Sequence, residues 1–218
     1  MKDCVLFLHG SYYRRHVEFY CRLCRGKYLV AVDGGYRFFR KAGLVPDLLI
    51  GDMDSLGKVP ADLSPRTRVV KFPSRKDKTD AQLALEYCLE AGAHAVDVVS
   101  PGVGEIDHFL GNLMLLDVGR RFRKRRPPPR VRLVAVRWEA VLVDDGARTF
   151  VDCVGDMVSV IPVSSTIRLS CRGTEYAAGD VVIRRGDSRG LRNRIMKGRA
   201  VFRIKGKALI VRRFPAVK

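Results

Sequence analysis

The residues of this sequence with the clearest chemical potential are two aspartates, Asp52 and Asp54, in the stretch GDMDS. Two like charges this close repel, and each raises the pKa of the other unless something positive lies between them. A metal ion or a lysine or arginine side chain would supply that charge, and water alone is the remaining alternative. The chain has 41 basic and 23 acidic residues, so a carboxylate pair marks a candidate site.

Other aspartates also stand just past apolar runs. They are Asp33, Asp77, Asp80 and Asp107. Open parallel sheets bind ligands beyond the carboxyl ends of their strands, so we expect these carboxylates to gather at one edge. A single aspartate after a strand is ordinarily a turn or helix-cap residue. The repetition, together with Gly34, Gly35 and Gly51, favours a site.

Magnesium is the ion that fits this pattern of oxygen ligands. It is usually bound by one or two carboxylates, with substrate phosphates and waters completing the shell. Residues 52 and 54 point the same way in extended backbone and are placed to share one ion. Asp80 is expected on the first turn of a helix, where the helix dipole favours the ionised carboxylate. Lys76 and Lys78 are placed to meet phosphate oxygens.

The elements that must position these side chains alternate between buried strands and helices in the first half of the chain. Uninterrupted apolar runs are typical of strands buried on both faces, and they lie at 5–8, 28–33, 47–52, 68–73 and 95–100. Helical patterns lie near 14–24, 35–42, 79–91 and 107–119. This alternation predicts a mainly parallel, doubly wound sheet. Thr79 followed by Gln82 forms a capping box at the start of the third helix.

The pattern changes at the basic and proline-rich tract RRFRKRRPPPR (120–130). This composition predicts a solvated, extended linker, with a nucleic-acid-binding tract as the alternative. Beyond it, strand-like runs separated by turn residues predict a small antiparallel sandwich or barrel. We therefore expect an α/β domain at 1–125 and an all-β sandwich domain at 126–218.

The composition limits the partners and the compartment. The net charge of +18 favours an anionic partner, either a nucleic acid, a phosphorylated small molecule or an acidic surface, unless it reflects a genome-wide bias toward arginine. The first apolar run is too short for a signal peptide, and no stretch approaches the roughly 20 apolar residues of a membrane span. We expect a cytoplasmic protein whose six cysteines are reduced thiols.

Three segments, in this order, carry a resemblance to the thiamine pyrophosphokinase family. They are VAVDGGYRFFRKAGLVPDLLIGDMDSL (30–56), FPSRKDKTDAQLALEYCLEAGA (72–93) and GVGEIDHFLGNLMLL (102–116). The segments GDMVSVIPVS (155–164) and RGTEYAAGDVVIRRGDSRGLRNRI (172–195) match more loosely.

The resemblance implies a reaction that moves the β,γ-pyrophosphoryl group of ATP onto the thiamine hydroxyl and releases AMP. It implies Mg²⁺ as cofactor, an ATP-binding catalytic α/β domain, and a sandwich domain that binds the acceptor and forms a homodimer with a shared active site. Neither a membrane nor a specific nucleic acid is implied as a partner. The alternative acceptor is another heterocyclic alcohol, such as a hydroxymethylpterin. A second alternative is a nucleic-acid-binding protein that uses the basic surface.

Carried over by motif, the resemblance implies a role for each candidate residue. The catalytic residues are Asp52, Asp54, Asp77 and Asp80. The metal ligands among them are Asp52, Asp54 and Asp80. The nucleotide-binding residues are Asp33, Gly34, Gly35, Asp107, His108 and Asn112, to which we add Gly10 because it follows the first strand. The substrate-binding residues are Lys76, Asp80, Tyr176 and Asn193.

Three positions depart from the family pattern. Glu105 stands where the family has an arginine, and this position bears on nucleotide binding. Arg192 replaces a serine and Tyr176 replaces a tryptophan, and both of these positions bear on the acceptor pocket.

Overall fold

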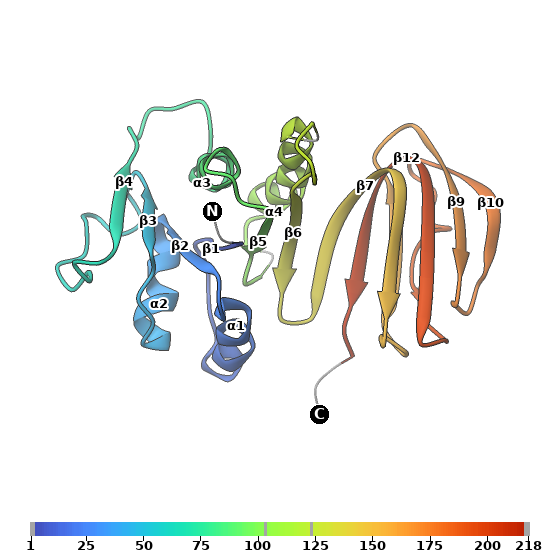
Figure 1. The fold of residues 1–218 in the computed structure, drawn as a ribbon, viewed down its shortest axis with the longest axis horizontal. Coiled ribbons are helices and arrows are strands. Elements are labelled where there is room, and N and C mark those ends of the chain that lie inside the picture. The colour runs from blue at the N-terminus through green and yellow to red at the C-terminus, as the bar shows by residue number, and fades with distance from the viewer. Residues whose placement is uncertain (1–2, 103, 123, 216–218) are drawn as a thin grey trace. The chain divides into compact units, whose positions relative to one another are not determined.

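The computed structural model describes residues 3–102, 104–122 and 124–215 (Figure 1). The chain divides into two compact units, Met1–Val136 and Arg137–Lys218. Each unit has its own core, so each is described separately.

The first unit is built on a parallel sheet, as the alternation of runs predicts. Its strands lie in the order β6-β5-β1-β2-β3-β4. They are β1 (Cys4–Phe7), β2 (Tyr28–Val32), β3 (Leu48–Gly51), β4 (Arg68–Lys71), β5 (Ala95–Val99) and β6 (Arg130–Ala135). Strands β2 to β4 extend to one side of β1, and β5 and β6 extend to the other. The strand order therefore reverses beside β1, which is where sheets of this kind bind ligands.

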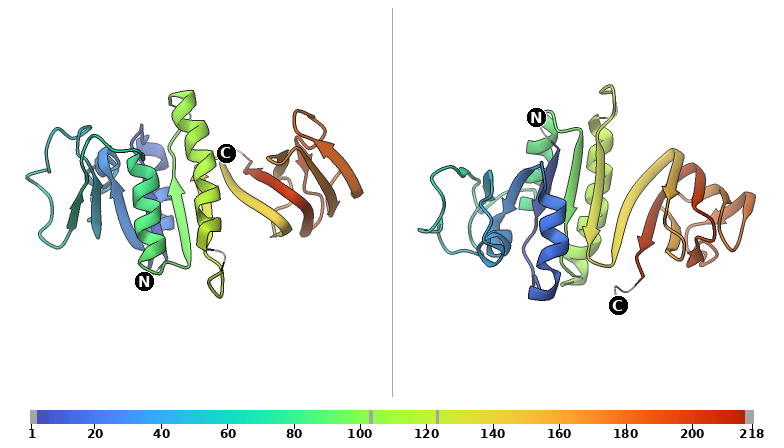
Figure 2. Two further views of the ribbon diagram at one scale, coloured as in Figure 1. Left: turned by 90° about the horizontal axis from the view of Figure 1, so that it is seen from above. Right: turned by 60° about the horizontal axis from the view of Figure 1, so that its bottom comes forward.

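Helices cover both faces of this sheet (Figures 1 and 2). Helices α1 (Val17–Cys24) and α2 (Tyr36–Ala42) lie on one face, and α3 (Asp80–Glu90) and α4 (Ile106–Met114) lie on the other. Short 3₁₀ helices precede or extend them: η1 (Arg14–His16), η2 (Asp33–Gly35) and η3 (Leu115–Phe122). Thr79 caps α3, because its Oγ1 accepts a hydrogen bond from the Gln82 N–H at 3.3 Å.

Aromatic side chains fill the space between the sheet and the helices α1 and α2. Phe7 of β1 stacks on Phe38 of α2, with ring centroids 4.1 Å apart, and meets Tyr20 of α1 edge to face at 6.1 Å. All three rings are fully buried. Such aromatic pairs contribute about 0.5–1.5 kcal/mol each beyond the area they bury, so they fix the helices against the end of β1.

The boundary between the units lies further along the chain than the 125/126 position that the sequence suggests. Strand β6 pairs in parallel with β5, in a register that sets Val131 opposite Val96. The first unit therefore includes β6 and extends to Val136. A short apolar run does not reveal whether its neighbour is parallel or antiparallel, so the proline tract looked like the domain boundary.

Part of the basic tract contacts the first unit, although Lys124, Arg126, Pro127 and Pro128 are exposed, as expected of a solvated segment. Arg121 pairs with Glu86 of α3, with Nη1 and Oε1 2.7 Å apart, and Arg120 pairs with Asp117 at 3.3 Å. Arg125 donates hydrogen bonds to three main-chain carbonyls at the end of α3, those of Leu89, Gly92 and Ala93, at 2.9–3.3 Å. Arg123 lies outside the described residues. These contacts give much of the positive charge of the tract a structural role.

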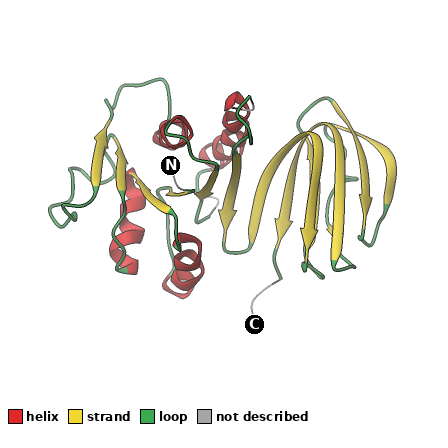
Figure 3. Ribbon diagram, in the orientation of Figure 1, coloured by secondary structure: helices red, strands yellow, loops and turns green. Residues whose placement is uncertain are grey.

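The second unit is antiparallel in its strand pairings (Figure 3). Its strands are β7 (Trp138–Val151), β8 (Met157–Pro162), β9 (Thr166–Arg172), β10 (Ala178–Arg184), β11 (Asn193–Arg194) and β12 (Arg199–Arg213). The long strands β7 and β12 pair with each other along most of their length. A bulge between Ile204 and Lys207 interrupts this pairing, and β12 changes its second neighbour from β9 to β8 there. Apolar side chains from the strands enclose one core, which includes Phe150, Val160 and Phe202.

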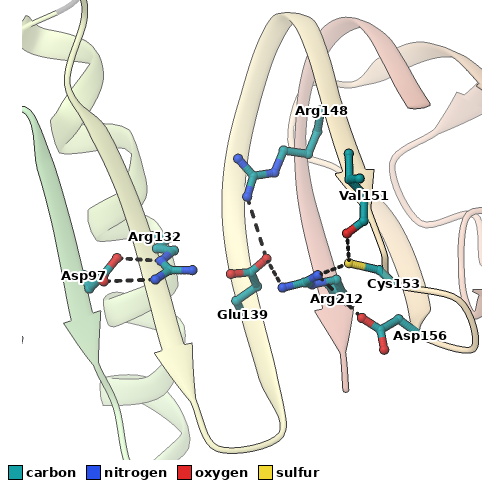
Figure 4. Close-up of polar contacts among 8 residues, drawn as sticks. All are labelled: Asp97, Arg132, Glu139, Arg148, Val151, Cys153, Asp156 and Arg212. Carbon is teal, nitrogen blue, oxygen red and sulfur yellow. Dashed lines mark hydrogen bonds and ion pairs between the residues drawn. The ribbon is translucent and has the colours of Figure 1, made fainter. Parts of the chain in front are cut away.

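Each unit buries carboxylates that are paired with cations (Figure 4). In the first unit, Asp97 of β5 accepts from Arg132 Nε at 2.5 Å and from Lys27 Nζ at 2.6 Å. Burial alone would raise the pKa of Asp97, but these two cations hold it below its usual value. In the second unit, Arg212 lies 3.0 Å from Glu139 Oε1 and 3.5 Å from Asp156 Oδ2.

Two further expectations concern membranes and thiols. Among the described residues, no helix has the length and apolar character needed to cross a membrane. The six cysteines are free thiols, as expected.

The contacts of Arg125 predict that this residue stabilises the end of α3. We expect Arg125→Gln to lower the free energy of unfolding of the first unit by about 1–3 kcal/mol, because three buried carbonyls lose a charged donor. Urea denaturation followed by far-ultraviolet circular dichroism measures this unit, since α1 to α4 all belong to it. The control is Arg126→Gln, which removes the same charge from an exposed neighbour. Equal effects of the two variants would contradict a capping role.

Candidate active site

The loop after β3 brings Asp52 and Asp54 together. Asp52 is buried and Asp54 is exposed, and their carboxylate oxygens lie within 4.8 Å of each other. The backbone between them is not extended as we expected, because Met53 has φ +69° and its side chain is buried. The two carboxylates are therefore neighbours through a turn that is anchored by a buried methionine.

Asp33 belongs to the same carboxylate cluster. It follows β2, and its carboxylate lies within 4.8 Å of those of Asp52 and Asp54. Its side chain is buried, and Oδ1 has no hydrogen-bond partner in the structure. A buried carboxylate oxygen without a donor is costly unless a cation reaches it. We call Asp33, Asp52 and Asp54 the carboxylate cluster.

Glycines let the segment that carries Asp33 lie against β1. A Cβ at Gly35 would fall 1.8 Å from the carbonyl oxygen of Phe7, and one at Gly34 would fall 2.0 Å from His9 Nδ1. Neither position accepts a side chain without movement of the backbone or of His9. The structure thus gives both glycines a packing requirement directly beside the carboxylate cluster.

Gly10 has the same kind of requirement on the loop after β1. Its φ is +152°, and a Cβ there would lie 2.5 Å from Cγ of Pro101, in the loop after β5. The loops that follow β1 and β5 therefore meet where the strand order of the sheet reverses.

Lys76 joins the carboxylate cluster to α3. Its Nζ donates to Asp52 Oδ2 at 2.5 Å and lies 3.2 Å from Asp80 Oδ1. The second contact is an ion pair without hydrogen-bond geometry, because Asp80 Oδ1 has no hydrogen-bond partner. The side chain of Lys76 is only 14% exposed. Lys76 thus supplies a positive charge between Asp52 and Asp80.

The protonation equilibria follow from these contacts. The hydrogen bond from Lys76 lowers the pKa of Asp52, against the opposing effect of burial. Burial would lower the pKa of Lys76, but Asp52 and Asp80 overcome it and raise the value. Burial also raises the pKa of Asp80, and Lys76 offsets this only in part because the charges of Asp52 and Asp33 add to it.

The remaining residues of the KDKTD segment have separate environments. Asp77 is exposed. Lys78 donates to Glu86 Oε2 at 2.7 Å, so its ammonium is paired with α3, and its side chain is 44% exposed. Asp80 begins α3, directly after the capping Thr79, where the helix dipole favours a carboxylate.

Three of the predicted nucleotide-binding residues lie on α4. Asp107 and His108 are exposed and Asn112 is partly exposed. Asp107 Oδ1 accepts from the His108 N–H at 2.8 Å, and His108 Nε2 lies 3.8 Å from Glu105 Oε2. These contacts join Asp107, His108 and Glu105 to one another at the start of α4.

Tyr176 and Asn193 contact each other in the second unit. Asn193 Oδ1 accepts from the Tyr176 N–H at 3.0 Å, and Asn193 Nδ2 donates to the Tyr176 carbonyl at 2.7 Å. Both ends of the Asn193 amide therefore hold the backbone of Tyr176, whose side chain is 67% exposed. Arg192 has φ +60° and an exposed side chain. Asn193 is thus placed to position the backbone of Tyr176.

From the sequence, Lys76 was expected to bind phosphate and Asp33 to bind the nucleotide. The sequence did not predict that both side chains lie next to Asp52. One signal was available. Lys76 and Asp80 are four residues apart, which places a lysine beside a carboxylate when the segment leads into a helix. No comparable signal links Asp33 to Asp52, because their proximity depends on the pairing of β2 with β3.

The parallel sheet with carboxylates beyond the ends of its strands defines a ligand-binding α/β domain. Comparison with known proteins is more specific. The model of the thiamin pyrophosphokinase catalytic domain matches residues 22–125. The thiamine pyrophosphokinase of Bacillus subtilis (strain 168) is 27% identical over 193 residues, which cover 84% of this chain and 86% of that protein.

Solved structures agree over nearly the whole chain. The crystal structure of thiamine pyrophosphokinase from Bacillus subtilis has a TM-score of 0.81 at 23% identity and covers 98% of this chain and 100% of its own. That of thiamin pyrophosphokinase from Geobacillus thermodenitrificans has a TM-score of 0.77 at 26% identity, with 100% and 99% covered. Residues 22–125 are therefore similar to the catalytic domain of thiamine pyrophosphokinases, and the chain has the fold of the solved structures of these enzymes.

The ion pair between Lys76 and Asp52 predicts a pH-dependent contribution to stability. The folded state lowers the pKa of Asp52, so this contribution is present above the usual pKa of an aspartate and is lost as the pH falls through the lowered value. We expect Asp52→Asn to lower the free energy of unfolding of the metal-free protein by about 1–3 kcal/mol at neutral pH. The difference from the wild type should vanish in acid.

The control for this measurement is Asp54→Asn, because Asp54 is exposed. Its free energy of unfolding should equal or exceed the wild-type value, because the substitution removes a like charge beside Asp52 and leaves the ion pair with Lys76 in place. Urea titrations at several pH values, with a chelator present, give both comparisons. Equal stability of Asp52→Asn and wild type at neutral pH would contradict a stabilising pair.

Proposed function

We propose that this protein transfers the pyrophosphoryl group of ATP to the hydroxyl of thiamine, giving thiamine diphosphate and AMP. The observation that carries the proposal is the carboxylate cluster with Lys76, which lies at the ends of parallel strands inside the segment that matches the family's catalytic domain. Transfer to a pterin alcohol and a nucleic-acid-binding role are not favoured by the family matches.

The donor set suits a hard divalent cation. It consists of carboxylate oxygens, and two of them, Oδ1 of Asp33 and Oδ1 of Asp80, are buried without a hydrogen-bond donor. We propose that Asp52, Asp54 and Asp80 hold Mg²⁺, as the family resemblance implies, with Asp33 beside them. When bound, Mg²⁺ supplies positive charge that neutralises the phosphate chain of ATP.

The protein's own groups then bind and orient the reactants. The ammonium of Lys76 lies beside Asp52, at the same edge of the sheet as the carboxylate cluster, and is placed there to donate to a phosphate oxygen. Asp77, at the exposed end of the same segment, remains a catalytic candidate because its carboxylate is accessible to substrate. In the transfer, the hydroxyl oxygen of thiamine forms a bond to the β-phosphorus, the bond between that phosphorus and the oxygen that leaves with AMP breaks, and the hydroxyl proton is released to solvent.

The nucleotide is expected to occupy the edge of the sheet where the loops after β1, β2 and β5 come together. Gly10, Gly34 and Gly35 let these loops pack closely against one another. Asp107, His108 and Asn112 on α4 complete the proposed nucleotide-binding set, and their exposure leaves them accessible to a ligand.

We propose that the second unit binds the acceptor and that the protein is a homodimer with a shared active site. The exposed ring of Tyr176, held through its backbone by Asn193, is suited to stack on a planar heterocycle. Thiamine is a cation, so the face of an aromatic ring suits it further. The homodimer itself rests on the family resemblance.

The nucleotide product tests the reaction directly. Pyrophosphoryl transfer must release AMP, whereas a phosphoryl-transferring kinase or an ATPase releases ADP. We expect AMP in equal amount to thiamine diphosphate when the protein is incubated with ATP, Mg²⁺ and thiamine and the products are separated by ion-exchange chromatography.

Asp52→Asn and Asp54→Asn should each reduce the rate by on the order of 10²–10³. ADP as the main product, or near-normal rates in both variants, would contradict the proposal.

The acceptor site predicts a selective effect on thiamine. Tyr176→Ala should raise the KM for thiamine about two- to tenfold, the loss expected for one stacking contact, and leave the KM for ATP nearly unchanged. Asn193→Ala should have the same selectivity, because it releases the backbone that carries the ring. The control is Tyr13→Ala, another exposed tyrosine in the first unit.

Mixing two different variant protomers tests the shared site. Tyr176→Ala protomers mixed with an excess of Asp52→Asn protomers should show the wild-type KM for thiamine, because the site in each hybrid dimer that has an intact Asp52 would receive Tyr176 from the other protomer. A KM that stays at the Tyr176→Ala value in a verified mixed dimer would mean that each site is built within one chain.

A further inference from the structure

We propose that Lys76 is the resident cation of the carboxylate site and that it competes with the divalent ion, thereby setting the affinity for metal before nucleotide binds. This inference rests on the proposed function, because it concerns the proposed magnesium ligands. In this role, Lys76 pairs with the carboxylates before nucleotide binds, and it contacts phosphate only afterwards. Lys76 is a positioning residue in this role, since it acts through the carboxylates.

The geometry places the ammonium where it shares the proposed metal ligands. Lys76 Nζ lies 2.5 Å from Asp52 Oδ2 and 3.2 Å from Asp80 Oδ1, so it bridges carboxylates from the loop after β3 and from the start of α3. The side chains of Lys76 and Asp52 are 14% and 6% exposed. The pair is therefore shielded from water, and its attraction is screened far less than that of a surface pair.

The same carboxylates cannot serve both cations fully. Magnesium demands near-ideal octahedral oxygen geometry at short distances, and an ammonium 2.5 Å from a ligand oxygen would lie beside it with the same sign of charge. Metal entry therefore requires Lys76 to leave Asp52. Without metal, departure of Lys76 would leave buried carboxylates uncompensated, which is costly. The ammonium consequently remains on the carboxylates until another cation replaces it.

When a metal ion replaces Lys76 on the carboxylates, the movement of the Lys76 ammonium toward the nucleotide suits the proposed reaction. Lys76 stands at the end of a flexible four-carbon side chain, so a modest change of rotamer moves its charge without moving the backbone. The new partner available to it is a phosphate oxygen of the nucleotide. Nucleotide and metal then strengthen each other's binding, because each removes the ion pair that opposes the other.

The experiment measures metal binding directly, in the absence of nucleotide. Mn²⁺ serves as the probe, and electron paramagnetic resonance counts the free ion during titration of the intact protein. If Lys76 occupies the carboxylates for about nine tenths of the time, then Lys76→Met should bind Mn²⁺ about tenfold more tightly than the wild type. Lys76→Arg, which keeps a competing cation, should stay near the wild-type affinity.

A second readout separates competition from a general structural effect. Without metal, Lys76→Met should melt at a lower temperature than the wild type, because the carboxylates lose their counter-charge. Saturating Mn²⁺ should raise its melting temperature by more than it raises that of the wild type. The matched control is Lys58→Met, which removes the same charge from an exposed position after the carboxylate loop and should leave Mn²⁺ affinity unchanged.

The outcomes distinguish this inference from the proposed function. Unchanged or weaker Mn²⁺ binding by Lys76→Met, with binding still abolished by Asp52→Asn, would overturn the competition and leave the metal site standing. Binding that is insensitive to Asp52→Asn would overturn both. Equal tightening by Lys58→Met would assign the effect to net charge and would also overturn the competition.

Discussion

The structure of the first unit depends on the compensation of negative charge at one edge of its sheet. Two ionised carboxylates within 4.8 Å repel each other by about 3 kcal/mol or more at an effective dielectric constant of about 20. That energy is a large fraction of the stability of a typical domain. Lys76 offsets it by bridging Asp52 and Asp80, so the loop after β3 and the start of α3 are held together by charge as well as by packing.

Packing holds the same edge from the other side. The 3₁₀ turn that carries Asp33 lies against β1 only because Gly34 and Gly35 lack side chains. Met53 anchors the next loop in the aromatic core that also contains Phe7 and Phe38. The polar cluster is therefore supported by buried apolar contacts within a few residues of each charge. Such support is what keeps charged groups at fixed positions when they gain or lose a ligand.

Local patterns in the sequence predicted the strands and helices at this edge of the sheet. They did not predict which strands pair with each other or which distant side chains are in contact. The runs at 28–33 and 47–52 became β2 and β3, and Thr79 caps α3, because each depends on residues close in sequence. The membership of β6 in the first sheet depends on a partner more than 30 residues away, and so it escaped notice. Arg125 likewise looked like a solvated charge, although it caps a helix that ends long before it. The turn at Met53 was not predicted, because the short motif GDMDS does not indicate whether its methionine is buried in a turn or exposed in extended backbone.

The hydrogen bonds from the Asn193 amide fix the backbone of the loop that carries Tyr176, and they do so independently of the side chain at residue 176. Two hydrogen bonds of the Asn193 amide go to the main chain of Tyr176, and a third goes from Nδ2 to Cys171 Sγ at 3.7 Å. Any residue that tolerates the backbone conformation receives the same support there. The ring at this position is therefore replaceable without loss of the loop geometry, so a change of the side chain at residue 176 alters what the loop presents but not its shape.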